Sequence, residues 1–433
     1  MAESKKKVLF VCSFSSQKIR ERLLLKKWKL RNMLMRYLKH PRFVHLDKGV
    51  WASDFIQEFE KHPEYEYHVL SPHKGLKRSS QFFDLNGIHY CFFKSDYNLL
   101  TDTLNAKFKL EERSDYKRDR KVMREIINKV NPDIVVICGA ENPEYSSIAL
   151  DIDDRPVYVL LQTVLNNPKL AQYTNEARGY RADLEKRIFK KIRYFGTGGE
   201  KYYSLFHGIN PDALCLSIRF PSHKPPVFLD LEKKYDFVFF GRLTKNKGIE
   251  DAIKAMGKLV QTHPETTLCV IGGGQGGNSW IHRVVIENNV QNNIIFVPRF
   301  ELIDDLYKEV QKSRIALLPG ITAFNSTARE SILMGLPTIV YDLPRVKAIN
   351  AEKWCLLSAK MEDVDDLCAK MVFALDNPEE LAVIAANGKE YAENYYDNTL
   401  IGDKITANIK AIIDQYYQGV PIPKDLLFAM ERK

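Results

Sequence analysis

Short apolar runs alternate along this chain with longer amphipathic stretches, and the alternation forms two series. The first series has apolar runs at residues 7–12, 65–70, 89–93, 133–138 and 156–161, and the second at 237–240, 267–271, 293–297, 315–318 and 338–341. Stretches with helical periodicity, such as 119–130 and 183–191, lie between several of these apolar runs. Strands buried on both faces of a parallel sheet have this character, and crossover helices join them. The chain is therefore predicted to be an α/β protein.

The two series predict two doubly wound, Rossmann-like domains with parallel sheets. A proline-rich stretch marks the expected linker at residues 221–234, between an N-terminal domain at 1–220 and a second domain at 235–400. A helical amphipathic stretch at 390–417 leads into the C-terminal helical tail at 401–433, which is expected to cross back to the first domain. A chain of 433 residues is long enough for two or three separate cores.

Composition narrows the class of protein. No apolar run approaches the roughly 18 residues that span a bilayer, and residues 1–7 are polar and basic where a signal peptide needs an apolar stretch. We expect a cytoplasmic protein, with a peripheral position on the inner face of the cell membrane as the alternative. The seven cysteines are scattered, with no zinc-site spacing, so neither a metal nor a cofactor is expected.

Positive charge is concentrated near the amino terminus. Residues 16–42 contain ten basic side chains and one acidic one, which equals the whole chain's net charge of +9. Leucines at helical spacing accompany them, so the segment is predicted to be a basic amphipathic insertion. It suits an anionic membrane surface, but a solvated helix packed on its own domain explains the pattern equally well. No nucleic-acid partner is expected, because no recognisable reader motif accompanies the charge.

A glycine-bounded basic loop follows the predicted strand at 237–240. It begins with Gly241 and Arg242, continues through Lys247 and opens a helix after Gly248. Glycine lets the backbone approach a ligand, and two cations on one loop suit a diphosphate. An ordinary basic turn is the alternative.

A second motif reads Asn-Ser-Thr-Ala-Arg-Glu-Ser-Ile-Leu-Met-Gly-Leu-Pro at residues 325–337. A helix that begins near Asn325, Ser326 and Thr327 directs free N–H groups at any phosphate above the strand end. Glu330 either accepts hydrogen bonds from a ribose diol or forms a capping box with Thr327, and spacing does not separate the two. Gly272, Gly273 and Gly274 provide a third loop, which alone is weak evidence for a phosphate site.

Together these motifs resemble the retaining, family 4-like glycosyltransferases of the GT-B fold, over about residues 235–400. The resemblance implies a metal-independent enzyme that takes a sugar from a nucleotide-diphosphate donor, with polysaccharide or glycolipid assembly as its setting. By the same resemblance, Arg242 and Lys247 hold the diphosphate and act in catalysis, Glu330 holds the ribose and backbone near Arg299 the base. The other implied donor-binding residues are Gly241, Gly272, Gly273, Asn325, Ser326 and Thr327.

The chain departs from the family pattern at two positions. The family usually carries two glutamates eight positions apart, and the first falls at Thr322 here. It often has a histidine after the strand at 156–161, where this chain has Gln162. Gln162 and Glu141 are the candidate acceptor-side residues, although an exposed loop carboxylate is the favoured interpretation of Glu141. The acceptor is expected to be a glycan or a polyprenyl-linked sugar.

Three other classes of protein share some of these sequence features. A metal-dependent glycosyltransferase needs an Asp-x-Asp pair, and residues 151–153 and 363–365 have that spacing. A dinucleotide-dependent oxidoreductase lacks support, because no glycine fingerprint follows the first strand. A catalytically degenerate scaffold or nucleotide-binding subunit at a membrane is the main alternative, motivated by Thr322 and the basic segment.

Overall fold

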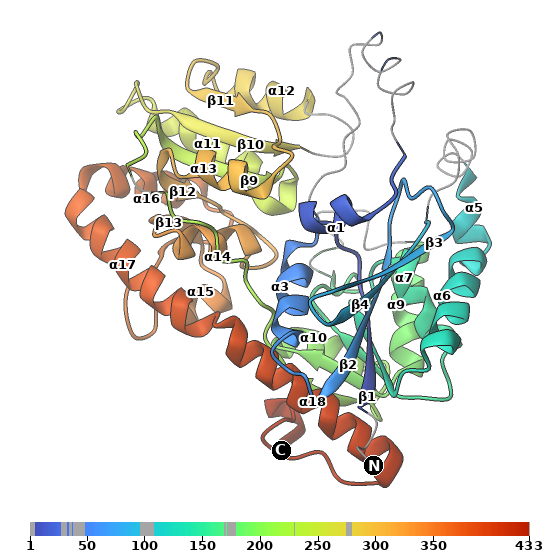
Figure 1. The fold of residues 1–433 in the computed structure, drawn as a ribbon. Coiled ribbons are helices and arrows are strands. Elements are labelled where there is room, and N and C mark those ends of the chain that lie inside the picture. The colour runs from blue at the N-terminus through green and yellow to red at the C-terminus, as the bar shows by residue number, and fades with distance from the viewer. Residues whose placement is uncertain are drawn as a thin grey trace. The chain divides into compact units, whose positions relative to one another are not determined.

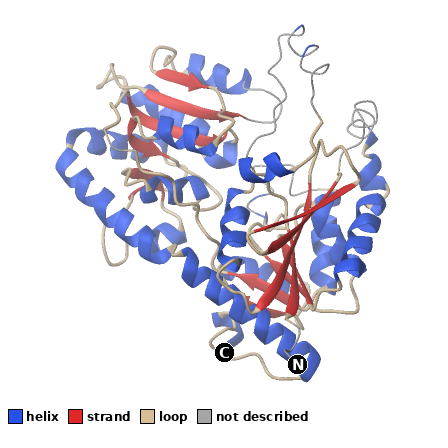
Figure 2. Cartoon of the chain, viewed as in Figure 1, coloured by secondary structure: helices blue, strands red, loops and turns tan. Residues whose placement is uncertain are grey.

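The structure is a computed structural model, and it describes residues 5–26, 33, 37, 48–95, 108–168, 170, 179–228, 230–273 and 279–432. The chain divides into two compact units (Figure 1). The first unit joins Met1–Pro221 to Asn398–Lys433, and the second is the continuous stretch Ser222–Asp397. Each unit is an α/β structure, as predicted, with helices around a central sheet (Figure 2).

The first unit is built on an eight-stranded sheet in the order β3-β4-β2-β1-β5-β6-β7-β8. The strands are β1 Lys6–Val11, β2 Tyr65–Pro72, β3 Ser80–Leu85, β4 Ile88–Phe93, β5 Ile134–Cys138, β6 Val157–Leu160, β7 Tyr194–Thr197 and β8 Leu214–Ser217. All neighbours pair in parallel except β3 and β4. Chain order reverses between β1 and β5, which makes this the switch point where open α/β sheets bind ligands.

The antiparallel edge strand β3 departs from the predicted parallel sheet. A tight turn at Asn86 and Gly87, with φ of 52° and 77°, joins β3 to β4. Asn-Gly favours the left-handed conformation at both central positions of such a hairpin turn. The dipeptide is therefore the local sequence signal for this hairpin.

Helices cover both faces of the first sheet. They are α1 Gln17–Arg22, α3 Val50–Phe59, α5 Leu110–Arg113, α6 Lys117–Val130, α7 Pro143–Ser146, α9 Tyr180–Lys191, α10 Glu200–His207 and α18 Asn398–Gln418, with 3-10 turns η1 Ser147–Asp151 and η4 Ala429–Arg432. The core on one face combines α3 with α18, and the core on the other combines α6, α9 and α10. The return of the C-terminal helix to the first domain is thus confirmed, through packing of α18 on α3.

The predicted helical tail is interrupted. Helix α17, Pro378–Tyr395, ends in the second unit, and α18 begins at Asn398 in the first. The stretch at 390–417 is therefore helical as predicted except at residues 396–397, and it is divided between two helices.

The second unit has a six-stranded parallel sheet in the order β11-β10-β9-β12-β13-β14. Its strands are β9 Tyr235–Arg242, β10 Leu268–Gly273, β11 Ile294–Val297, β12 Ser313–Leu317, β13 Thr338–Tyr341 and β14 Leu357–Ala359. Its helices are α11 Ile249–Leu259, α12 Ser279–Glu287, α13 Ile303–Val310, α14 Ser326–Leu333, α15 Pro344–Ile349, α16 Val364–Asp376 and α17, with the 3-10 turn η3 Lys245–Lys247. This strand order is that of a Rossmann-type domain, and the switch point falls between β9 and β12.

Little of the basic segment at 16–42 is described. Helix α1 ends at Arg22, because Leu23 is extended with φ −91° and ψ 138°. Most of residues 27–42 lie outside the described part of the chain, so the predicted amphipathic insertion stays a prediction. Among the described helices, none combines the length and apolar character needed to cross a bilayer.

Candidate functional site

Two loops lie on either side of the switch point of the second sheet. One begins where β9 ends at Arg242 and carries Lys247. The other follows β12 and leads through residues 318–325 to α14. The loops are in direct contact, since the backbone N–H of Ile321 donates to the carbonyl oxygen of Asn246 at 3.1 Å. The two halves of the predicted donor site therefore meet at one point of the sheet edge.

Close backbone packing explains two of the glycines. At Gly248, which has φ of 79°, a Cβ would lie 1.9 Å from the carbonyl oxygen of Pro319. At Gly272, with φ of 152°, it would lie 1.9 Å from the carbonyl oxygen of Gly241. Both positions combine a backbone conformation that L side chains rarely adopt with no space for one. The strand-end backbones are thereby held close together.

The amine of Lys247 reaches the start of α14. Its Nζ donates to Asn325 Oδ1 at 2.5 Å, and Asn325 is the N-cap residue of this helix. The Asn325 side chain makes no capping hydrogen bond. The first-turn N–H groups of α14 therefore receive no hydrogen bond acceptor from the Asn325 side chain. These groups and the helix dipole favour binding of an anion.

Burial and charge perturb Lys247 strongly. Burial, reinforced by the positive charges of Arg242 and Arg329, lowers the pKa of its amine from 10.5 to about 7, while Glu330 acts in the opposite direction. Three cationic side chains and one carboxylate thus converge around the start of α14. A partly buried cluster with excess positive charge is an electrostatic site for an anionic ligand.

Arg329 is a member of this cluster that sequence analysis did not select. Its Nε is buried and has no hydrogen-bond partner among the described residues, and its guanidinium lies 5.5 Å from the ring centre of Tyr396. Arg329 stands inside the motif at 325–337, next to Glu330. Only its electrostatic effect on Lys247, which requires the folded chain, distinguishes it from an ordinary helical arginine.

The capping-box alternative for Glu330 is wrong. Helix α14 begins at Ser326 with Asn325 as its N-cap. Thr327 is therefore inside the first turn, and Glu330 lies five positions after the cap, whereas a capping box needs the acidic residue at the third.

The other predicted donor residues lie at the same edge of the sheet. Gly241 ends β9 beside Thr327, since a Cβ on Gly241 would lie 3.3 Å from Thr327 Cγ2. Ser326 is exposed at the first position of α14. Gly272 and Gly273 end β10, and Arg299 is exposed after β11, one strand further along.

Both acceptor-side candidates lie in the first unit. Gln162 is half-buried after β6, and Glu141 follows β5 at the switch point of that sheet. Burial, together with the charge of Glu185, raises the pKa of Glu141 to about 7, and its Oε2 is shielded from solvent. Interpretation of Glu141 as an exposed loop carboxylate is therefore wrong. The residue is held in place because Arg181 Nε donates to its carbonyl oxygen at 2.9 Å.

Both Asp-x-Asp pairs have structural partners. Asp151 forms ion pairs with Arg120 and Arg124, and Asp153 pairs with Lys191 at 2.7 Å. The other pair lies at the start of α16, where the Asp363 side chain caps the helix and Asp365 pairs with Lys258 at 2.6 Å. These contacts account for all four carboxylates without a catalytic metal.

Residues 224–391 match the model of the family described as glycosyl transferases group 1. The second unit, Ser222–Asp397, therefore matches this family over nearly its whole length. The family predicted from the motifs is thereby confirmed, and the match spans the loop after β9 and the whole of α14.

Curated relatives agree over part of the chain. Glycogen synthase of Mycobacterium tuberculosis is 27% identical over 185 residues, which is 42% of each chain. A GDP-mannose-dependent mannosyltransferase that acts on a monoacylated phosphatidylinositol monomannoside, from Corynebacterium glutamicum, is 24% identical over 38% of this chain and 44% of its own length. The matches cover only about two fifths of these relatives.

Solved structures match nearly the whole chain in fold. Sucrose-phosphate synthase from Thermosynechococcus elongatus has a TM-score of 0.67 at 13% identity, covering 96% of this chain and all (100%) of its own. Anabaena HepE in complex with UDP-glucose has a TM-score of 0.62 at 12% identity, covering 93% and 99%. The predicted architecture of two Rossmann-like domains is confirmed by these matches.

Proposed function

We propose that this protein is a glycosyltransferase that moves a sugar from a nucleotide-diphosphate donor to an acceptor hydroxyl, with retention at the anomeric carbon and without a metal. The observation that carries the proposal is the convergence of Lys247, Arg242 and Arg329 on the start of α14. The match of the second unit to the group 1 family supports it.

The cationic cluster suits the chemistry of the leaving group. When the bond between the anomeric carbon and phosphate breaks, negative charge develops on the departing diphosphate. Cations and helix N–H groups that contact this charge more strongly in the transition state accelerate the reaction. Arg242 and Lys247 are the proposed catalytic pair, and the first turn of α14, with Ser326 and Thr327, is the proposed phosphate cradle.

The remaining donor contacts follow from the family resemblance. Glu330 is proposed to accept hydrogen bonds from the ribose, and backbone near Arg299 to contact the base. Thr322 replaces the carboxylate that usually meets the donor sugar. A hydroxyl can donate or accept one hydrogen bond but carries no charge, so we expect a weaker hold on the sugar than in relatives with glutamate.

Similar proteins narrow the donors to test. HepE was solved with UDP-glucose, and a pneumococcal O-GlcNAc transferase that matches 67% of this chain was solved with UDP and GlcNAc. The Corynebacterium relative is GDP-mannose-dependent. A thermal-shift panel of UDP, GDP and ADP with their glucose, GlcNAc and mannose conjugates identifies the nucleotide, because binding to the native state raises the melting temperature.

The acceptor is proposed to bind the first unit, where Glu141 and Gln162 follow the ends of β5 and β6. A carboxyl group with a pKa of about 7 can take up a hydroxyl proton at neutral pH. The basic residues of 16–42 favour an acceptor on an anionic lipid surface, such as a polyprenyl-linked sugar.

The decisive test is transfer by Arg242→Ala. Losing one preorganised charge contact to the leaving group is expected to lower turnover about 100-fold or more. Lys258→Ala is the matched control, because Lys258 is an exposed cation of the same unit, on α11, and pairs with Asp365. Wild-type turnover by the Arg242 variant contradicts the proposal.

A catalytically degenerate binding protein is the second candidate, favoured by Thr322. The two are separated by measuring donor hydrolysis and transfer with the nucleotide sugar that binds. If the protein binds the nucleotide sugar but neither hydrolyses nor transfers it, while an active glycosyltransferase assayed in parallel does, the result supports the degenerate binding protein.

A further inference from the structure

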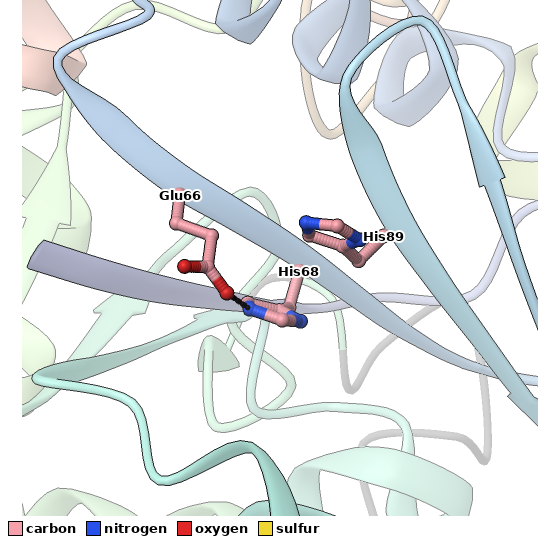
Figure 3. Close-up of side chains that lie close together, drawn as sticks. All are labelled: Glu66, His68 and His89. Carbon is pink, nitrogen blue, oxygen red and sulfur yellow. Dashed lines mark hydrogen bonds and ion pairs between the residues drawn. The ribbon is translucent and has the colours of Figure 1, made fainter. Parts of the chain in front are cut away.

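Two histidines and a glutamate lie close together near the amino-terminal ends of strands β2 and β4 in the first sheet (Figure 3). Glu66 and His68 are two residues apart on β2, and His89 pairs with His68 across the parallel β2–β4 ladder. Side chains two apart in a strand point to the same face. The three side chains therefore share one face, and each offers a ligand atom within 4.8 Å of the others.

The neighbouring strand orients His89 for metal binding. Asp84 on β3 faces His89 across the β3–β4 hairpin, and its Oδ1 lies 2.7 Å from His89 Nδ1. An ionised carboxylate can only accept a hydrogen bond, so Nδ1 carries the proton and Nε2 keeps the lone pair. Metal-binding histidines are held by carboxylates in this way.

Glu66 and His68 form the other half of the cluster. Glu66 Oε1 lies 2.7 Å from His68 Nε2, and the His68 and His89 rings stack with centres 4.8 Å apart. Lys7 Nζ on β1 is 3.7 Å from the same Glu66 oxygen. In the metal-free protein this carboxylate therefore contacts a proton on His68 and a nearby ammonium, which an incoming cation replaces.

We propose that Glu66, His68 and His89 form a binding site for Zn²⁺, with Asp84 as the residue that positions His89. Imidazole nitrogen combined with one carboxylate oxygen suits zinc, whereas Ca²⁺ and Mg²⁺ prefer oxygen ligands alone. Bound zinc joins β2 to β4 beside the β3–β4 hairpin. The site is independent of the proposed transferase chemistry, since it lies near the amino ends of these strands rather than at their carboxyl ends.

Small side-chain movements complete the site. With zinc–ligand bonds of about 2.0–2.1 Å, neighbouring ligands in a tetrahedral site lie about 3.4 Å apart. Atoms now within 4.8 Å must close by up to about 1.4 Å, which rotation of the half-exposed His89 and Glu66 side chains can supply. Three protein ligands leave the fourth position to water, so exchangeable binding is expected.

The test is calorimetric titration of the full-length, chelator-treated protein with ZnCl₂ alone, supported by Co²⁺ absorption spectra. We expect about one zinc per chain, a tetrahedral Co²⁺ spectrum and a zinc-dependent rise in melting temperature. Asp84→Asn is expected to weaken zinc about 10–100-fold, as loss of a positioning carboxylate does. The His68→Gln/His89→Gln double variant is expected to lose the site, and Lys7→Met, which removes the competing cation, to bind zinc more tightly.

His62→Gln is the matched control. His62 also lies between two carboxylates, but Glu64 contacts its Nδ1 and Asp403 its Nε2, each at 3.3 Å, on opposite sides of the ring. Its affinity for zinc should equal that of the wild type. Circular dichroism verifies the fold of each variant. Absence of saturable micromolar zinc binding by the wild type, or wild-type affinity in a folded double variant, overturns the proposal.

Discussion

Replacing Lys247 by methionine should stabilise the protein while it damages the proposed donor site. The folded structure lowers the pKa of this amine from 10.5 to about 7. At about 1.4 kcal/mol per pKa unit, keeping the amine charged at pH 7 or below costs about 5 kcal/mol of folding free energy. Methionine removes that cost, but it also removes the hydrogen bond to Asn325, worth about 1.5–3 kcal/mol. The expected net gain is about 2–3 kcal/mol.

The pH dependence gives this prediction its sign. Between pH 7 and 10.5 the unfolded chain binds the lysine proton and the folded one does not, so wild-type stability rises with pH across this window. The advantage of the Lys247→Met variant should therefore be largest at or below pH 7 and should vanish near pH 10. Calorimetric melting at pH 6.5, 8 and 10 measures it, as a rise of about 2–4 °C per kcal/mol at the lowest pH.

Lys258→Met serves as the control, because the Lys258 side chain is exposed and its replacement removes no cost of burying a charged amine. A Lys247→Met protein that is no more stable than wild type at pH 6.5, or whose advantage is the same at every pH, refutes the reasoning.

Four further predictions follow from the same contacts. Nucleotide-sugar affinity should fall by up to about tenfold per pH unit above 7, because Lys247 must then take up a proton to pair with the diphosphate; calorimetry in two buffers of different ionisation enthalpy detects that uptake. Arg329→Gln should weaken nucleotide binding about 10–100-fold, measured by the same titration. Gly248→Ala should destabilise the protein by at least about 2 kcal/mol in urea unfolding, because its Cβ meets the Pro319 carbonyl oxygen at positive φ. Glu141→Gln should stabilise it by up to about 3 kcal/mol above pH 7 and not at all near pH 4, because burial raises the pKa of Glu141 from 4.5 to about 7; unfolding at both pH values checks this.

Strands buried on both faces were the predictable part of the fold. The apolar run at 237–240 lies within β9, Tyr235–Arg242, and the run at 65–70 within β2, Tyr65–Pro72. The edge strand β3 was not predicted, because its residues are half-buried or exposed and form no continuous apolar run. The break between α17 and α18 was not predicted, because the amphipathic pattern continues where the chain passes from the second unit to the first.

The donor-site residues predicted from the sequence are those for which a single loop carries the signal, whereas other residues of the cluster are recognised only from their positions in the fold. The glycine and basic pattern around Arg242 and Lys247 is local, and so is the start of α14. Involvement of Arg329, by contrast, depends on the fold bringing its charge near Lys247, a residue 82 positions away in sequence. Glu141 shows the same limit, because a loop residue is expected to be exposed and only tertiary packing buries its carboxylate.

The return of α18 has a consequence for how the protein is made. Ile401, Ile405, Ile409 and Ile412 of this helix belong to the core that also holds β1 and α3. Ribosomes release these isoleucines only after every residue of the intervening second unit has emerged. Domains usually mature in the order of synthesis, but here the continuous stretch Ser222–Asp397 can finish first. The core of the first unit therefore stays incomplete, with an apolar face uncovered, until α18 has been synthesised.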